Sequence, residues 1–146
     1  MKGLTFYRFR SEWRLASRER VFEALEDLKG YVAWWPEVKT VKCIAEGRFE
    51  VVVRATLPYE LRFITSQSVL DKNTAIIEAG LRGDLNGFSR WTLSQENGRT
   101  VAVFDEEVHT GKRLLNVLAP VARPAFRYNH TLMMRHGQDG LRRLLA

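Results

Sequence analysis

The chain has a single cysteine, Cys43, among its 146 residues. One cysteine cannot form a disulfide within the chain, and it cannot supply the several thiolates of a cysteine-based zinc site. Cys43 stands beside Ile44 in an apolar segment, so we expect a buried and inert thiol at this position.

Long hydrophobic runs are also missing. No segment is apolar over 18 residues, and charges interrupt residues 1–13, so neither a transmembrane span nor a signal peptide is predicted. Glycine-rich phosphate loops and Ser–His–Asp or Cys–His arrangements are absent from the sequence as well. We expect a soluble, cytoplasmic protein with one domain over residues 1–146, which can bury about 70% of its unfolded surface.

Positive charge is concentrated at the end of the chain. The net charge is +6, and residues 112–146 hold seven bases and one acid, which leaves residues 1–111 neutral. This pattern is typical of a solvated helix face whose C-terminal end favours cations. The alternative is a docking patch for an acidic protein or an anionic surface. Nucleic acid is not expected as a partner.

Alternating apolar and polar residues predict strands along most of the chain. Residues 5–15 form the first, and a series of short segments separated by turns covers residues 38–109. Asn97-Gly98 is a strong hairpin signal within that series. The predicted strands of the series are 38–45, 49–57, 61–70, 74–81, 85–95 and 100–109. Consecutive strands with tight turns indicate an antiparallel meander.

Helical patterns precede and follow that meander. The first helix begins after Ser17 and ends at Gly30, and a short second helix ends at Trp34-Trp35 before Pro36. A long helix spans residues 121–144, with Pro120 or Pro124 at its start or at a kink. The order β-α-α-β-β-β-β-β-β-α predicts an α+β fold in which a curled sheet of six to seven strands grips the terminal helix.

One stripe of the terminal helix is predicted to face the sheet. Its members recur at helical spacing and are Ala122, Phe126, Asn129, Met133, His136, Gly137, Gly140 and Leu144. Arg127 and Arg135 fall on the opposite, solvent-facing side. Asn129 and His136 place polar groups inside the stripe, and the glycines at 137 and 140 leave gaps in it. We expect a ligand chamber between this stripe and the sheet, with close approach of a strand as the alternative explanation of the glycines.

Four segments together resemble a known superfamily. They are residues 17–25, residues 34–38, residues 87–93, and a terminal group that comprises Asn129, His130, Met134, Gly137, Gly140 and Leu141. In this order and spacing the chain resembles the START-like (SRPBCC) superfamily of polyketide cyclases/dehydrases and lipid-transport proteins, from residue 6 to residue 144. The resemblance implies the helix-grip fold and a hydrophobic cavity that holds a lipid, a polyketide or a quinone-like molecule.

Candidate catalytic groups come from two places. His136 and Asn129 are seven residues apart on one helix face, where a histidine could transfer protons and an amide could polarise a carbonyl. The run Asp105-Glu106-Glu107 lies in a predicted strand, so at least one of the acids points inward; Glu106 is our candidate for a base. The alternative for His136 and Asn129 is a structural hydrogen bond to a strand backbone. The alternative for the acid is exposure at a bulge or at the open end of the sheet, or pairing with a basic residue.

Other residues are candidates for the cavity wall because they are small or because they carry a polar tip on an apolar body. The full set of predicted ligand-binding residues is Trp35, Tyr59, Phe63, Ser89, Trp91, Phe126, Asn129, Met133, His136 and Gly137. The alternative for each is simple core packing. No acid lies at a helical offset that matches His130, and His109 stands alone at a strand end, so no metal and no cofactor is predicted.

Three functions are compatible with these patterns. The first is a carrier of a hydrophobic small molecule. The second is an enzyme of the cyclase/dehydratase kind, without a metal, that uses His136, Asn129 or an acid of residues 105–107. The third is an interaction module that docks through the basic helix face.

Four charged residues on neighbouring predicted strands are assigned to charge pairs on the outer face of the sheet, with no function. They are Arg54, Arg62, Glu78 and Arg90.

Overall fold

The structure is a computed structural model that describes residues 6–54, 60–111 and 122–146. Tyr59 and Pro120 lie outside the described residues. The described helical segments are α1 (Arg18–Glu26), the 3₁₀ turn η1 (Leu28–Gly30), α2 (Tyr31–Trp34) and α4 (Ala122–Leu145). The described strands are β1 (Phe6–Leu15), β2 (Val38–Ala45), β3 (Arg48–Arg54), β4 (Glu60–Asp71), β5 (Ile76–Gly83), β6 (Leu85–Glu96) and β7 (Arg99–Thr110).

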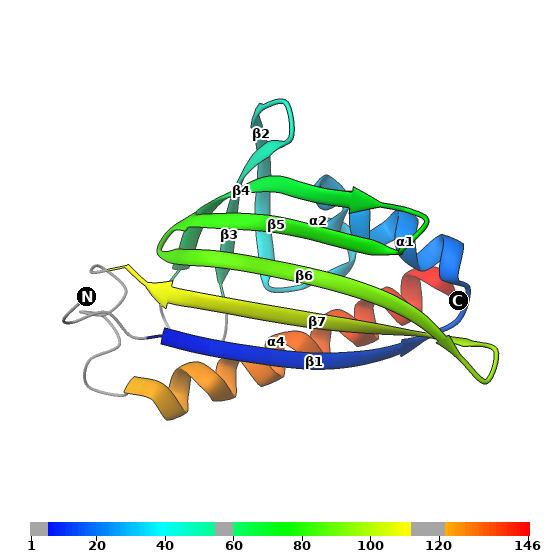
Figure 1. The fold of residues 1–146 in the computed structure, drawn as a ribbon. Helices are drawn as coiled ribbons and strands as arrows, with labels where there is room; N and C mark the ends of the chain where they lie inside the picture. The colour runs from blue at the N-terminus through cyan, green and yellow to red at the C-terminus, as the bar shows by residue number, and fades with distance from the viewer. Residues whose placement is uncertain (1–5, 55–59, 112–121) are drawn as a thin grey trace.

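The strands form one antiparallel sheet of seven strands in the order β1-β7-β6-β5-β4-β3-β2. Each strand from β2 to β6 pairs with the next one along the chain, and β1 forms the edge of the sheet beside β7. The sheet curls, and α4 runs along its concave side while α1 and α2 cover one end (Figure 1). This is the helix-grip arrangement that the sequence predicts, and the strand limits differ from the predicted ones by at most two residues where both are described.

The inner face of β1 shows why alternation is a reliable signal. Tyr7, Phe9, Trp13 and Leu15 are all buried, whereas the arginines between them are exposed. The side chains of a strand point alternately to its two faces, so one apolar set reaches the core and one charged set reaches water.

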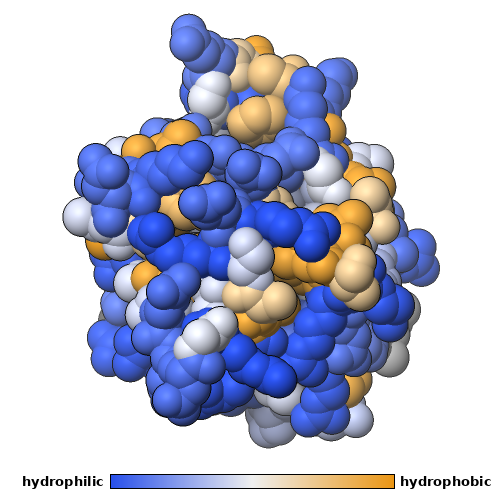
Figure 2. Space-filling model, turned by 90° about the vertical axis from the view of Figure 1, so that its right-hand side faces the viewer, coloured by the Kyte–Doolittle hydropathy of each residue, from blue (hydrophilic) through white to orange (hydrophobic). Residues whose placement is uncertain are grey.

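The edge strand β2 departs from expectation. Six of its eight residues are exposed, and Cys43 is among them. The β2–β3 hairpin projects beyond the rest of the sheet (Figure 1), and it forms a knob at the top of the space-filling view (Figure 2). The prediction of a buried thiol is wrong because this end of the hairpin extends past the helices that cover the core.

The helices between β1 and β2 are shorter than predicted. α1 ends at Glu26, and Gly30 lies in η1 rather than closing the first helix. The second helix is confirmed, and it delivers Trp34 and Trp35 to the core, where both are buried. They join Trp13, whose ring lies 6.1 Å from that of Trp34 and 5.1 Å from that of Trp35.

α4 packs on the sheet along a line slightly rotated from the predicted stripe. Phe126 is buried and Met133 partly buried, and Arg127 and Arg135 are exposed, as predicted. Leu144 is 49% exposed, however, so its assignment to the buried stripe is wrong. The core contact at this end of α4 is made by the fully buried Leu141, with Leu145 one turn later, which turns Leu144 toward water.

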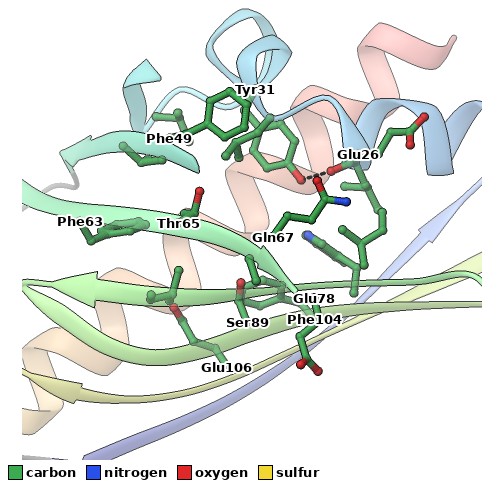
Figure 3. Close-up of a pocket in the computed structure, with 18 of the residues that line it drawn as sticks. Glu26, Tyr31, Phe49, Phe63, Thr65, Gln67, Glu78, Ser89, Phe104 and Glu106 are labelled. Atoms are coloured by element: carbon green, nitrogen blue, oxygen red, sulfur yellow. Dashed lines mark hydrogen bonds between the residues drawn. The ribbon is translucent and has the colours of Figure 1, made fainter. Parts of the chain in front are cut away.

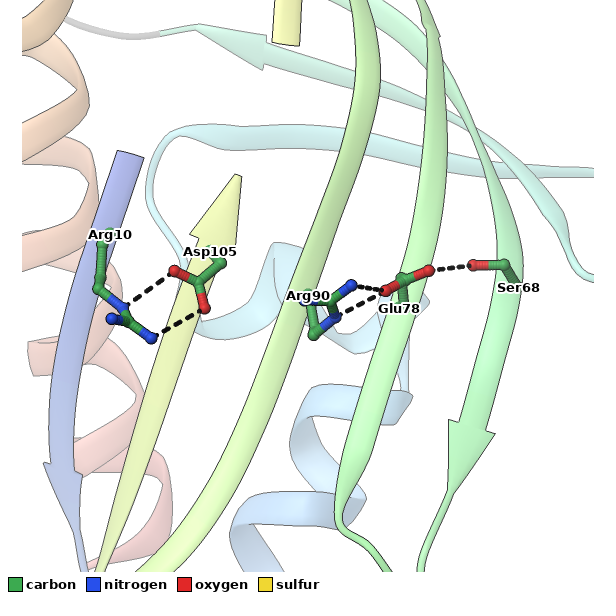
Figure 4. Close-up of polar contacts among 5 residues, drawn as sticks. All are labelled: Arg10, Ser68, Glu78, Arg90 and Asp105. Carbon is green, nitrogen blue, oxygen red and sulfur yellow. Dashed lines mark hydrogen bonds and ion pairs between the residues drawn. The ribbon is translucent and has the colours of Figure 1, made fainter. Parts of the chain in front are cut away.

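The outer face of the sheet carries charge pairs between neighbouring strands. Figure 4 shows Arg10 paired with Asp105, at 3.0 Å, and Arg90 paired with Glu78. Arg62 binds Glu50 at 3.1 Å in the same way, whereas Arg54 makes no ion pair within the described residues. The predicted outer face is therefore correct, and these partly exposed pairs contribute little stability each.

Among the described residues, no helix is long and apolar enough to span a membrane.

Candidate functional site

A cavity of about 160 Å³ lies between the concave face of the sheet and the helices (Figure 3). Its wall is mainly apolar, and aliphatic and aromatic side chains reach it from the six strands β2 to β7 and from every described helical segment. Its main lining residues are Leu25, Leu28, Tyr31, Trp35, Val38, Phe49, Val51, Val53, Phe63, Thr65, Ile77, Ala79, Leu81, Ser89, Trp91, Phe104, Glu106 and Met133. Three further lining residues are exposed, namely Glu26, Gln67 and Leu70, and they mark its opening.

The floor of the cavity contains one row of residues that crosses four strands. Strand register pairs Gln67 with Ala79, Ala79 with Ser89, and Ser89 with Glu106. Directly paired residues project from the same face of a sheet, about 5 Å apart from strand to strand. The row therefore has a polar opening at Gln67, a small apolar residue at Ala79, and a polar inner end at Ser89 and Glu106.

Glu106 resolves the question posed by the three consecutive acids. It is only 7% exposed and faces the cavity (Figure 3), whereas Asp105 and Glu107 point outward and pair with Arg10 and Arg8. The prediction that one acid of this run points inward is confirmed, because β7 is a regular strand here and its side chains alternate.

Glu106 has a buried partner that the sequence analysis did not assign to it. The Nε2 atom of His130 lies 3.0 Å from Oε1 of Glu106, and both side chains are less than a tenth exposed. The imidazole is also stacked on Phe9, with ring centres 3.7 Å apart. His130 is thus held in place by a carboxylate on one edge and an aromatic ring on its face.

The predicted pair of His136 and Asn129 does not form. Nδ1 of His136 lies 2.5 Å from Oε2 of Glu37, and its side chain is 44% exposed at the rim of α4, outside the cavity wall. Asn129 is buried but does not line the cavity, and its Nδ2 has no hydrogen-bond partner in the described part of the chain. The two residues therefore cannot act on one ligand atom as the sequence suggested.

The predicted cavity residues separate into two groups. Trp35, Phe63, Ser89, Trp91 and Met133 line the cavity.

Phe126, Asn129, His136 and Gly137 are not among the lining residues. The ring of Phe126 instead packs against Tyr7 and Phe9, at 4.5 and 5.9 Å between ring centres. Tyr59 lies outside the described residues.

The glycines of α4 have a different role from the one expected. A Cβ at Gly137 would lie 2.5 Å from Cε2 of Trp35 and 2.8 Å from Cη2 of Trp13, and a Cβ at Gly140 would overlap the carbonyl oxygen of Trp34. The gaps are filled by tryptophan rings and by the backbone of α2. The expectation that Gly137 leaves space for a ligand is wrong.

Two hydrogen bonds fix the aromatic end of the cavity. The indole N–H of Trp35 donates to the carbonyl oxygen of Met133 at 2.9 Å, which ties α2 to α4. The hydroxyl of Tyr31 donates to the carbonyl oxygen of Leu25, and burial raises the pKa of this phenol above its usual value of 10.0. Tyr31 was not predicted as a cavity residue, although it is the first residue of the aromatic segment 31–35.

The basic face of α4 is partly engaged with the strand that it covers. Arg123 donates to the carbonyl oxygen of Phe6 at 3.2 Å and lies over the ring of Tyr7. Arg142 donates to the carbonyl oxygen of Arg14 at 3.1 Å. In the described residues no three His, Cys, Asp or Glu side chains are grouped as a metal site would require.

Several solved structures share this fold. The Zhui aromatase/cyclase from Streptomyces sp. R1128 superposes with a TM-score of 0.73 at 15% identity, over 94% of this chain and 91% of that one. A START superfamily protein from Mycobacterium smegmatis gives 0.69 at 18% identity, over 94% of each chain. Norcoclaurine synthase from Thalictrum flavum, in complex with dopamine and hydroxybenzaldehyde, gives 0.62 at 11% identity, over 98% of this chain and 88% of that one.

No protein-family model and no curated protein matches the sequence. At identities this low the likeness establishes the START-like helix-grip fold, and function has to be argued from the cavity itself.

Proposed function

We propose that this protein binds a hydrophobic small molecule, such as a lipid, a polyketide or a quinone-like compound, in the cavity between the sheet and α4. The observation that carries the proposal is a mainly apolar wall with a few polar side chains, chiefly Thr65, Ser89 and Glu106. The cavity is open to solvent near Gln67 and Leu70. Ligand sites generally combine such a wall with a few placed polar groups.

The size of the cavity supports the same function. A dry, apolar cavity of about 150 Å³ is enough to bind benzene in another protein. The cavity here is of comparable volume before any side chain moves, and its opening allows a larger ligand to extend outward. The aromatase/cyclase and the norcoclaurine synthase among the structural neighbours are named for action on, or shown bound to, small organic molecules.

A cavity-filling substitution tests the proposal. Ala79 is a small residue in the middle of the floor, so Ala79→Leu should occupy the space that a ligand needs. Ala45→Leu is the matched control, because Ala45 is an exposed strand residue that does not line the cavity. Both variants and the wild type are titrated with the neutral apolar dye N-phenyl-1-naphthylamine, whose emission rises in an apolar site.

We expect the wild type and Ala45→Leu to bind the dye with equal affinity and Ala79→Leu to bind it at least tenfold more weakly. Equal binding by all three, with Ala79→Leu folded by circular dichroism, would refute the proposal. Native mass spectrometry of the freshly purified protein would then identify any molecule that it retains.

The Glu106–His130 pair favours acid–base catalysis as a second candidate function. A carboxylate at the wall of an apolar cavity, with an imidazole in contact with it outside the lining set, can pass a proton to or from a bound carbonyl compound. The pair replaces His136 and Asn129 as the site of the cyclase/dehydratase chemistry considered from the sequence.

Proton exchange tests this second function without knowledge of the substrate. The ketone 2-tetralone is incubated with the protein in D₂O, and incorporation of deuterium beside the carbonyl is followed by mass spectrometry. Catalysed exchange that disappears in Glu106→Leu would identify an enzyme. Exchange at the buffer rate, with the ketone bound, would support a carrier.

A further inference from the structure

We propose that Ser89 and Glu106 form a polar subsite that selects ligands with a hydroxyl group on an otherwise apolar ring. This inference rests on the proposed function of the cavity and names the class of molecule that fits it. The two residues are direct partners in the β6–β7 register and face the same cavity (Figure 3).

The hydrogen-bonding capacity of the two side chains is only partly used within the protein. Oε1 of Glu106 contacts Nε2 of His130, and its second oxygen has no partner in the described part of the chain. The hydroxyl of Ser89 likewise makes no hydrogen bond to the described residues. Glu106 is buried and Ser89 is partly buried, and neither of the two unpaired oxygens is sealed inside the described part of the protein, so both can be reached by a ligand atom in the cavity.

Donor and acceptor roles decide which ligand group fits. An ionised carboxylate only accepts hydrogen bonds, whereas a serine hydroxyl both donates and accepts. A ligand hydroxyl can donate to Glu106 and accept from Ser89 at once, which satisfies both. An ammonium group can donate to both residues, but it leaves the Ser89 proton without an acceptor and its charge has to be desolvated in a mainly apolar wall, and a ligand carboxylate would meet the Glu106 carboxylate with like charge.

The rest of the wall restricts the remainder of the ligand. Of the three described acidic residues that line the cavity, only Glu106 is buried: Glu78 turns toward Arg90, and Glu26 is exposed at the opening. Trp91 stands two residues after Ser89 on β6, and Phe104 stands two residues before Glu106 on β7. Their rings lie 4.7 Å apart and give the subsite an aromatic flank. A phenol-like group on an aromatic ring is therefore the best match in shape and polarity.

The test compares two ligands of nearly equal shape, 2-naphthol and 2-methylnaphthalene, by displacement of N-phenyl-1-naphthylamine. We expect the wild type to bind 2-naphthol about tenfold more tightly, which corresponds to one good hydrogen bond to a charged acceptor. Ser89→Ala should lower that ratio to about threefold, and Glu106→Leu to about one. Ser94→Ala, at an exposed position of the same strand, should keep the wild-type ratio.

The outcomes separate this inference from the proposed function. If both compounds bind the wild type equally, or if Ser89→Ala keeps the full ratio, the subsite is refuted while the cavity stands. If neither compound nor the dye binds, the proposed function fails as well. Binding of 2-naphthoate as tight as that of 2-naphthol would overturn the donor requirement. Should Glu106→Leu fail to fold, the conservative Ser89→Ala variant decides alone.

Discussion

The contact between α4 and α2 at Gly140 gives the sharpest stability prediction. A Cβ at this position would overlap the carbonyl oxygen of Trp34 and lie 2.9 Å from its carbonyl carbon. These are backbone atoms and cannot rotate aside as a side chain can. Overpacking of this kind costs about 1–3 kcal/mol or more, and Gly→Ala in a helix returns about 1 kcal/mol. We expect Gly140→Ala to lower the free energy of unfolding by about 2 kcal/mol.

Thermal unfolding followed by circular dichroism measures this change. For a chain of this size, about 2 kcal/mol corresponds to a fall in Tm of roughly 6 °C. Asp139→Ala is the control, because Asp139 is exposed on the adjacent position of α4 and should change stability by no more than about 0.5 kcal/mol. If the space at Gly140 were open for a ligand instead, Gly140→Ala would raise the Tm through helix propensity. An unchanged or higher Tm would refute the packing described here.

Three further predictions concern other parts of the structure. Leu141→Ala should destabilise the protein by about 2–5 kcal/mol, whereas Leu144→Ala, three residues later on α4, should cost less than about 0.5 kcal/mol; equal losses would mean that the buried face of α4 is misplaced. Because burial raises the pKa of Tyr31 in the folded state, its contribution to stability is complete below pH 10 and falls as the pH rises above it, so urea unfolding should show alkaline destabilisation that is weaker in Tyr31→Phe. Cys43 should react with Ellman's reagent in the folded protein, and a thiol that reacts only after denaturation would contradict the exposed β2 edge.

The sheet could be predicted from the sequence because its signals are local. Alternation in β1 and the Asn97-Gly98 turn each act over a few residues, and an antiparallel meander requires only that neighbours in sequence pair in space. The inward acid of residues 105–107 followed from the same alternation.

Which face of α4 packs against the sheet could not be predicted in this way. Adjacent helix residues point about 100° apart, so Asn129 and His130 compete for the position that faces the sheet. The structure shows that both are buried and that His130 reaches Glu106. The spacing of Phe126, His130, Met134 and Leu141 carried this signal, but the choice depends on contacts with β1 and β7.

The role of the glycines also depended on distant contacts. A helix pattern shows that Gly137 and Gly140 leave gaps, but it does not show what fills them. The Trp34-Trp35 pair, about a hundred residues earlier in the chain, fills both gaps. The two segments meet only in the folded protein, so the sequence pattern of the helix does not reveal this contact.

The central claim is that a small apolar molecule occupies the cavity, and methionine methyl NMR tests it most directly. The chain has three methionines, of which Met133 lines the cavity and the adjacent Met134 is buried outside the lining set. With ¹³C-methyl-methionine protein and bound 2-methylnaphthalene, we predict intermolecular NOEs from the ligand to the Met133 methyl and none to the Met134 methyl. NOEs to Met134 alone, or a saturated complex with no NOE to Met133, would contradict the claim.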